Sequence, residues 1–503
     1  MMKELSRRAT LLYHPIRLSW VIVCFGIVTR LTQYIFNGSL WQDEAARALN
    51  IINRSFSELL QPLDYNQGAP IGFLMVEKLL VQLFGNTEYV LRLFPFLCGM
   101  ISLILFYKVA PHYIETKAIP VALGLFAISD KLLFSSSETK QYASDVLIAL
   151  LLYAIATYIR AKRLTPSRAA LFGVIGALAI WFSHPAIFIL AGVGVSLALF
   201  CLQRREWSRI GGLSVVFSLW LLSFAACYFV SLSNLTRNEV LLNLWRGTFM
   251  PFPPTTLSDA TWFVDTFLKI FRDPVGLSLP GVGAMVFLIG FISMLSERRK
   301  EFSLLVSPIL FTLLASGLHK YPFSGRLLLF IVPNLLLFIA EGVEQIRDKT
   351  SLDSSIIGLT VIGLLFYHPL SSAIAHIIKP STLEEIKPVI GYIREHHQEG
   401  DLLYLYYGSW PAFEYYSEKY GFKKSTYIIG VSSREDWSNY AEDLNKLRGN
   451  RRVWVLFSHV CTWRGVDEEK LFLYHLDNIG TRVDSFKGAG AAVYLYDLKG
   501  DIK

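Results

Sequence analysis

Residues 17–36 read RLSWVIVCFGIVTRLTQYIF, and residues 40–48 read LWQDEAARA. The first stretch is a mostly apolar run of the length that a helix needs to cross a bilayer, about 20 residues. Hydrophobic residues make up 53% of the 503 positions and charged residues 17%, whereas soluble domains carry about 25% charge. The sequence therefore predicts a polytopic α-helical membrane protein, whose first span leads to two adjacent carboxylates, Asp43 and Glu44.

Apolar runs of this kind recur along the first three quarters of the chain. Runs long enough to span, or slightly shorter where a helix can end inside a protein-lined cavity, predict eleven spans, near 17–36, 90–107, 118–133, 146–160, 169–183, 186–203, 210–232, 276–295, 302–318, 326–345 and 354–372. The run from Pro70 to Phe84 is shorter and carries Glu77 and Lys78 in its middle. It fits an amphipathic helix in the membrane interface as well as a span.

Loop charges predict the orientation. If 70–84 does not cross, the basic loop residues fall on one side, which the positive-inside rule makes cytoplasmic; they are Lys3, Arg7, Arg8, Lys108, Lys117, Arg160, Lys162, Arg163, Arg168, Arg204, Arg205, Arg209, Arg298, Arg299, Lys300, Arg347 and Lys349. The amino terminus is then cytoplasmic, and the carboxyl-terminal region lies outside the cytoplasmic (inner) membrane. These anchors account for most of the net charge of +8, so the charge indicates no nucleic-acid partner.

The composition changes after about residue 375, which predicts a membrane domain, 1–375, with a first outer loop, 37–89, and a soluble extracytoplasmic α/β domain, 376–503. In the second domain, helices are expected at 383–397, 411–420, 436–447 and 468–478, and strands at 402–407, 426–431, 452–457, 481–486 and 491–496. Alternating strands and helices predict a small, mostly parallel sheet with an antiparallel edge. No Gly-rich phosphate loop follows these strands, which favours a lid, a scaffold or an acceptor-docking module.

Polar residues gather in four segments that share the outer side under this topology. The segments are 37–70, whose polar residues include Gln67, 135–145, 183–185 and 319–326, and their candidate site residues are Asp43, Glu44, Glu138, Lys140, Tyr142, Asp145, His184, Lys320, Tyr321 and Arg326. Carboxylates, a histidine and several cations on one side predict a single outward-opening cavity near the lipid headgroups.

Each of these residues also has a purely structural interpretation. Asp43 and Glu44 could stabilise the first turn of a helix, and Lys140, Lys320 and Arg326 could be snorkelling anchors. His184 could cap a helix broken at Pro185. Arg30, inside the first span, could simply neutralise a loop carboxylate.

The order of the motifs resembles that of the GT-C glycosyltransferases that use polyprenyl-phosphate sugars. The resemblance covers about residues 15–345 and rests on Trp41-x-Asp43-Glu44-Ala45, Tyr65-Asn66-Gln67-Gly68-Ala69-Pro70, Glu138-x-Lys140-Gln141-Tyr142-Ala143-Ser144-Asp145, Ser183-His184-Pro185 and Tyr321-Pro322-Phe323-Ser324-Gly325-Arg326. The branches it resembles are protein O-mannosyltransferase-like and aminoarabinose-transferase-like enzymes, among them bacterial members that glycosylate envelope polysaccharide.

The resemblance implies an inverting transfer from a polyprenyl-phosphate sugar to a glycan, lipid or protein acceptor. Such chemistry needs a carboxylate to accept the proton of the acceptor and fixed cations beside the departing phosphate. Asp43 is the expected base, and Glu44 would orient the acceptor or a metal. Lys320, Tyr321 and Arg326 are expected at the phosphate with Lys140 and Tyr142 as helpers, and Glu138, Asp145 and His184 at the sugar or acceptor.

Three questions stay open in the sequence. Some GT-C enzymes require a divalent metal ion and others do not, and no second acidic cluster decides between them here. A transporter or flippase of lipid-linked sugars would use the same cavity without reacting, although the paired half-repeats of many transporters are not visible. A noncatalytic scaffold would tolerate substitution of Asp43.

Overall fold

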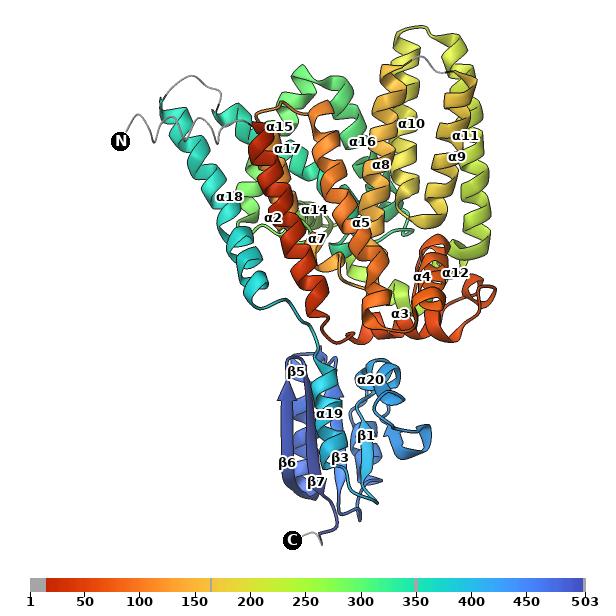
Figure 1. Ribbon diagram of the computed structural model, residues 1–503, viewed down its shortest axis with the longest axis vertical. Helices are drawn as coiled ribbons and strands as arrows, with labels where there is room; N and C mark the ends of the chain where they lie inside the picture. Colours follow the sequence, from red (N-terminus) through yellow and green to blue (C-terminus); the bar gives the residue numbers. More distant parts are fainter. Residues whose placement is uncertain (1–14, 163–164, 348–351, 501–503) are drawn as a thin grey trace. The chain divides into compact units, whose positions relative to one another are not determined.

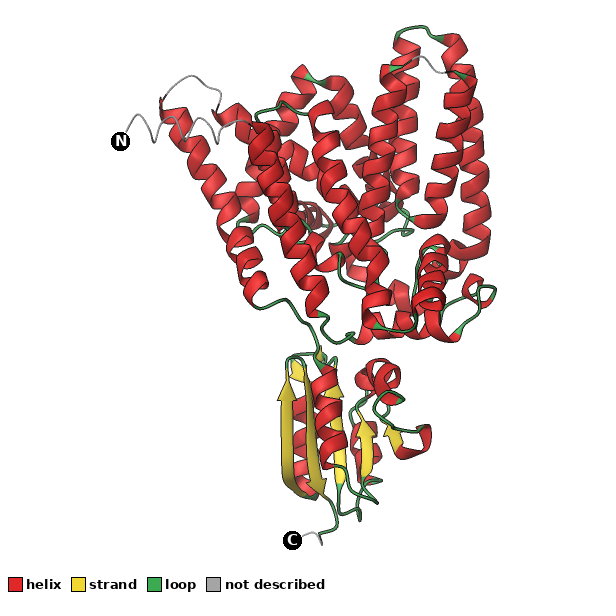
Figure 2. Ribbon diagram, in the orientation of Figure 1, coloured by secondary structure: helices red, strands yellow, loops and turns green. Residues whose placement is uncertain are grey.

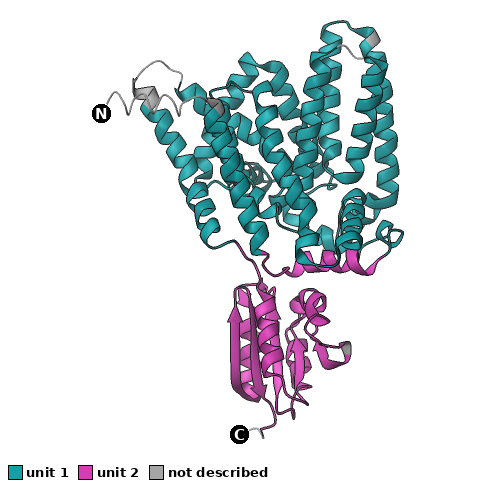
Figure 3. Cartoon of the chain, viewed as in Figure 1, with its two compact units in different colours: residues 1–36, 55–380 teal, residues 37–54, 381–503 magenta. Residues whose placement is uncertain are grey.

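The computed structural model describes residues 15–162, 165–347 and 352–500 (Figure 1). The described chain forms two compact units, which Figure 3 colours separately. The first contains residues 1–36 and 55–380, and the second contains residues 37–54 and 381–503. The predicted division placed the whole first outer loop in the membrane domain, whereas the structure groups residues 37–54 with the carboxyl-terminal residues.

The first unit is helical (Figure 2). Among the described residues, nine helices are long and apolar enough to cross a membrane. They are α2 (Pro15–Phe36), α5 (Glu88–Val109), α8 (Tyr142–Ala161), α10 (Ala186–Gln203), α11 (Trp207–Cys227), α15 (Pro280–Glu297), α16 (Arg299–Gly317), α17 (Val332–Arg347), which follows the 3-10 segment η5 (Gly325–Ile331), and α18 (Leu352–Ile378). They correspond to nine of the eleven predicted spans, which confirms a multi-pass membrane protein.

The other two predicted spans are shorter helices. The 169–183 run forms α9 (Pro166–Phe182), and the 118–133 run divides into α6 (Ile119–Ile128) and α7 (Asp130–Ser135). The run 70–84, which fits an interfacial helix as well as a span, forms α4 (Ile71–Phe84). The unit also contains α12 (Ser233–Leu235), α13 (Glu239–Leu244) and α14 (Leu257–Arg272). At 14 residues, α4 is shorter than a helix that spans a typical bilayer.

Arg30 explains how α6 can end inside the bundle. Its guanidinium donates to the carbonyl oxygens of Ala127 (3.0 Å) and Phe126 (3.4 Å), which belong to the last turn of α6, and to that of Gly26. The last carbonyls of a helix have no partner within it, and apolar surroundings supply no water. The expectation that Arg30 neutralises a loop carboxylate is therefore wrong: its hydrogen bonds go to backbone carbonyls.

Side-chain contacts bring several basic loops to one end of the helical unit. Arg160, at the end of α8, pairs with Glu301 at the start of α16 (2.8 Å). Arg298, between α15 and α16, pairs with Glu115 after α5 (3.1 Å). Arg209, in the first turn of α11, donates to the carbonyl oxygen of Ile159. This clustering agrees with the predicted one-sided charge, although Lys3, Arg7, Arg8, Arg163 and Lys349 lie outside the described residues.

Close helix packing forms the core of the first unit. A Cβ atom added at Gly290 of α15 would lie 1.9 Å from the carbonyl oxygen of Phe338, and one added at Gly342 of α17 would lie 1.9 Å from that of Val286. Small residues allow such backbone approach between membrane helices. α17 is thereby held centrally, and its residues from Val332 to Glu344 are all buried.

The second unit contains a five-stranded sheet in its described residues, with strand order β2-β1-β3-β7-β6. The strands are β1 (Leu402–Leu405), β2 (Tyr427–Ile429), β3 (Val453–Ser458), β6 (Thr481–Gly488) and β7 (Ala491–Asp497), and a separate ribbon pairs β4 (Thr462–Trp463) with β5 (Val466–Asp467). β1 is parallel to β2 and β3, whereas β7 is antiparallel to β3 and β6. The sheet is thus half antiparallel, not mostly parallel as predicted, because β7 pairs antiparallel with β3 as well as with β6.

In the described part of this unit, five α-helices accompany the sheet, and four of them were predicted with shifts of a few residues at their ends. They are α19 (Ile386–His396), α20 (Trp410–Ser417), α21 (Ser438–Asn445) and α22 (Glu468–Ile479), together with α3 (Gln42–Asn53) from the first outer loop. Glu468 is buried at the start of α22 and accepts hydrogen bonds from the hydroxyls of Tyr406, Tyr407 and Tyr440. Burial and the bond to Glu468 raise the pKa of Tyr406 and of Tyr407, so both phenols stay protonated as donors.

Candidate functional site

The turn between α7 and α8 carries Glu138 and Lys140 into the interior of the first unit. Both side chains are buried, with exposed fractions of 3% and 1%. The turn lies tightly against α5, since a Cβ atom added at Gly99 would be 2.4 Å from the Cβ of Ser136. A glycine at this point lets the polar turn pack against a membrane helix.

Lys140 binds the loop that precedes α4. Its Nζ donates to Oε1 of Gln67 at 2.8 Å. Charged side chains are almost never fully buried unless they form ion pairs or hydrogen bonds. The buried ammonium of Lys140 therefore indicates a polar site inside the first unit. Gln67 was noted in the sequence as a polar loop residue without a role, and its place in the Tyr65-Asn66-Gln67-Gly68 motif was the signal for one.

Arg326 lies beside Glu138 and Tyr142. One of its guanidinium nitrogens lies 3.8 Å from Oε1 of Glu138, and its Cζ lies 5.4 Å from the centre of the Tyr142 ring. The Arg326 side chain is 34% exposed. It can therefore meet a ligand while the carboxylate of Glu138 and the aromatic face hold its orientation.

Tyr321 and Asp145 extend the group. Burial raises the pKa of Tyr321 well above its usual value, and the nearby Asp145 and Tyr142 raise it further. The phenol is therefore a proton donor, and it donates to the carbonyl oxygen of Leu327 at 2.8 Å. Asp145, in the first turn of α8, is itself buried.

The remaining predicted site residues of the first unit are Lys320 and His184. Lys320 is exposed, and the hydrogen bond found for it is that of its backbone amide to Ala315, which fits the anchoring alternative better than a buried phosphate contact. His184 lies in the turn between α9 and α10, four residues before Phe188, whose ring centre is 5.1 Å from that of Tyr321. It is thus at the same end of the unit as Tyr321.

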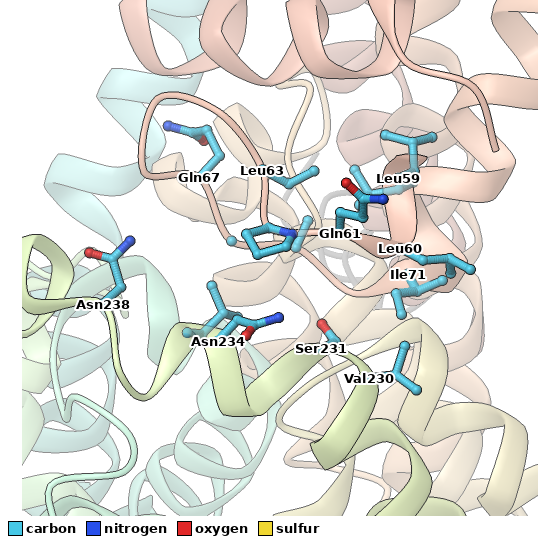
Figure 4. A pocket seen from close by; sticks show the side chains of 15 residues that line it. Leu59, Leu60, Gln61, Leu63, Gln67, Ile71, Val230, Ser231, Asn234 and Asn238 are labelled. Atoms are coloured by element: carbon cyan, nitrogen blue, oxygen red, sulfur yellow. The ribbon is translucent and has the colours of Figure 1, made fainter. Parts of the chain in front are cut away.

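A cavity of about 50 Å³ adjoins Gln67 in the first unit. Figure 4 shows its walls, made on one side by the loop from Leu59 to Ile71 and on the other by residues after α11. Leucine, isoleucine and valine side chains alternate with the amides of Gln61, Asn234 and Asn238. The nitrogen of the Asn238 amide lies 3.1 Å from the amide oxygen of Asn66, which ties the two walls together. An apolar cavity with amide groups therefore lies directly beside the residue that binds Lys140.

Asp43 and Glu44 belong to the second unit, in the first turn of α3. Glu44 is buried, whereas Asp43 is partly exposed. Carboxylates in a first turn are stabilised by the positive end of the helix dipole, so both the structural and the catalytic interpretation predict this placement. The predicted site residues are therefore divided between the two units.

Among the described residues, no group of three or more His, Cys, Asp and Glu side chains is arranged to hold a metal ion.

No protein-family model and no curated protein sequence matches the chain. Solved structures do. The ArnT structure from Cupriavidus metallidurans bound to undecaprenyl phosphate aligns with a TM-score of 0.55 at 11% identity, over 95% of this chain and 97% of that one.

Archaeal oligosaccharyltransferase structures from Archaeoglobus fulgidus align as well. AglB in complex with an inhibitory peptide and a dolichol-phosphate has a TM-score of 0.53 at 11% identity, over 96% of this chain and 74% of that one. The oligosaccharyltransferase complex with Zn and sulfate has a TM-score of 0.52 at 13% identity, over 95% and 73%. The chain therefore has the GT-C fold, as the motif order predicted.

Proposed function

We propose that this chain is an inverting glycosyltransferase that moves a sugar from a polyprenyl-phosphate donor to an envelope glycan, glycolipid or protein acceptor. The observation that carries the proposal is the interior cation Lys140, 2.8 Å from Gln67 and 1% exposed. The GT-C fold supports it, since the similar ArnT and AglB structures hold undecaprenyl phosphate and a dolichol-phosphate.

In this proposal, Lys140 and Arg326 bind the phosphate of the donor. An ammonium provides a point charge and a guanidinium provides two parallel donors. Both cations stabilise the negative charge that develops on the phosphate oxygen as its bond to the sugar C1 breaks. Tyr142 and Tyr321 orient the guanidinium and the loop that carries it. Lys320 becomes an anchor instead of a phosphate ligand.

Asp43 accepts the proton of the acceptor hydroxyl or amine as its oxygen or nitrogen attacks C1. The C1–O bond to the phosphate breaks with its electron pair, and polyprenyl phosphate leaves, so the configuration at C1 inverts. Glu44 orients the acceptor. Glu138, Asp145 and His184 contact hydroxyl groups of the sugar or the acceptor.

Release of polyprenyl phosphate tests this function. Purified full-length protein in nanodiscs is given a panel of polyprenyl-phosphate sugars and candidate acceptors, with and without a chelator, and the lipid products are separated by chromatography. We expect release that depends on the acceptor. Movement of intact donor across the bilayer without cleavage would identify a transporter instead, and an inert protein with every donor would contradict the proposal.

Arg326→Lys is expected to raise the KM for the donor by about tenfold, because an ammonium cannot reproduce the paired hydrogen bonds of a guanidinium although the charge remains. Steady-state kinetics against donor concentration measures the effect. Arg272→Lys, on α14, is the matched control. If Arg326→Lys behaves like the parent protein, Arg326 is an anchor and not a phosphate ligand.

We also propose that the carboxyl-terminal unit faces the outside and the basic loops face the cytoplasm, as the clustered basic residues predict. Single cysteines replace Tyr474, 71% exposed on α22, and Gln203, exposed at the end of α10, in a Cys461→Ser background. A membrane-impermeant maleimide should label position 474 in intact spheroplasts and position 203 only after lysis. The reverse pattern would invert the orientation.

A further inference from the structure

Two consecutive glutamates of the carboxyl-terminal unit hold the segment that leads into α3. Oε2 of Glu384 accepts from the backbone amide of Gln42 at 3.0 Å. The carboxylate of Glu385 accepts from the amide of Ser39 at 3.2 and 3.3 Å and from its hydroxyl at 2.8 Å. All these residues belong to the second unit, although more than 340 positions separate the partners in the chain.

These bonds replace a cap that α3 lacks. Its N-cap residue is Trp41, which makes no side-chain capping bond. The first amides of a helix need acceptors, and an anion is favoured at this end by the helix dipole. Glu384 therefore caps, from a distant part of the sequence, the helix whose second and third residues are Asp43 and Glu44.

Further contacts make the attachment rigid. The amide of Leu40 donates to the hydroxyl of Tyr416 (2.8 Å), and Nζ of Lys387 donates to the carbonyl oxygen of Asn37 (2.8 Å). Glu384 is also fixed on its other oxygen, which lies 2.7 Å from Nδ1 of His459. The segment 37–42 is thus tied at four backbone groups, the last of which belongs to the first residue of α3.

We infer that Glu384 and Glu385 are positioning residues for Asp43, so that the carboxyl-terminal unit sets the geometry of the base. The inference rests on the proposed function. It follows from geometry: the amide that Glu384 binds is one residue before Asp43, and an error of 1 Å in a reacting group can cost about 100-fold in rate. The terminal unit then acts in the chemical step instead of serving as a separate docking module.

Hydrogen exchange tests the attachment without any substrate. The variant is Glu384→Gln/Glu385→Gln. The control is Glu469→Gln, which also changes a carboxylate to an amide. Glu384 and Glu469 both line a cavity of about 340 Å³, but the Glu469 carboxylate accepts a hydrogen bond from the hydroxyl of Tyr494. Mass spectrometry of the full-length protein should show that a peptide covering 38–42 exchanges about tenfold faster in the double variant, because each charge-assisted bond contributes about that factor. The control should match the parent protein.

Kinetics tests the positioning role. We expect the double variant to lower kcat by about tenfold or more with an unchanged KM for the donor, whereas a merely structural defect would reduce the amount of active protein and leave kcat per active molecule unchanged. In an Asp43→Asn background the same two substitutions should cause no further loss, because residues that act through one group are not additive.

The outcomes separate the inference from the proposed function. If the parent protein transfers no sugar, the proposed function fails, and the exchange experiment still judges the attachment. Unchanged exchange in the double variant overturns the attachment. Faster exchange with unchanged kcat, or full additivity with Asp43→Asn, overturns the positioning role.

Discussion

Asp43→Asn is expected to lower kcat for sugar transfer by about 10²–10⁴-fold, the usual cost of removing a positioned general base. The amide keeps the shape of the carboxylate but cannot take the proton of the acceptor. Asp43 is partly exposed in the first turn of α3, so the substitution removes no buried charge. Single-turnover kinetics with saturating donor and acceptor measures the loss.

Glu58→Gln is the matched control, since Glu58 also begins a helical segment of the first outer loop and has no proposed role in the chemistry. It should retain the parent kcat. Donor binding by Asp43→Asn, measured with a nonreactive acceptor, should also be retained. Turnover of Asp43→Asn within a few-fold of the parent would exclude Asp43 as the base and would leave the helix-dipole interpretation of its position.

Lys140→Met is expected to lower kcat by about 10²–10³-fold, because it removes a fixed donor from the phosphate oxygen on which charge develops. The effect should be large because Lys140 is 1% exposed, and electrostatic interactions are stronger where water is excluded. Removing one partner of a buried charged interaction can cost about 3–5 kcal/mol of stability, so the variant is compared only after it is shown to fold. Thermal unfolding in the same nanodiscs checks this.

Lys320→Met is the control for Lys140→Met, since it makes the same change at an exposed lysine. We expect it to keep kcat and the donor KM within about twofold of the parent. A large loss for Lys320→Met together with normal turnover for Lys140→Met would restore the sequence-based expectation and move the phosphate site toward the exposed lysine.

The membrane part of the fold could be predicted because it depends on local composition. A helix that crosses a bilayer must form all its backbone hydrogen bonds internally and present apolar side chains over about 20 residues. Such apolar runs can be recognised in a single sequence. The strand and helix order of the carboxyl-terminal unit followed from short-range periodicity in the same way. The antiparallel share of its sheet did not, because pairing of β7 with β3 joins strands that are far apart in the chain.

The candidate site could be predicted in its residue types and less well in its geometry. Glu138, Lys140, Tyr142 and Arg326 were predicted as polar site residues at apolar boundaries, and the structure brings Arg326 to Glu138 and Tyr142 and Lys140 to Gln67. The ranking of the lysines was not readable, because Lys140 and Lys320 both follow an apolar helix in the sequence. Burial distinguishes them, and burial depends on which helices pack across each turn.

The residues alone thus determined a multi-pass membrane protein with an α/β tail, and they picked out a set of polar segments between its apolar runs. Only the tertiary structure decided that Arg30 completes the end of α6, that Lys140 is interior, and that α3 is capped by Glu384. The physical reason is common to all three. Hydropathy and periodicity are properties of neighbours along the chain, whereas an unpaired carbonyl, amide or charge is satisfied by whichever group the fold brings within hydrogen-bonding distance.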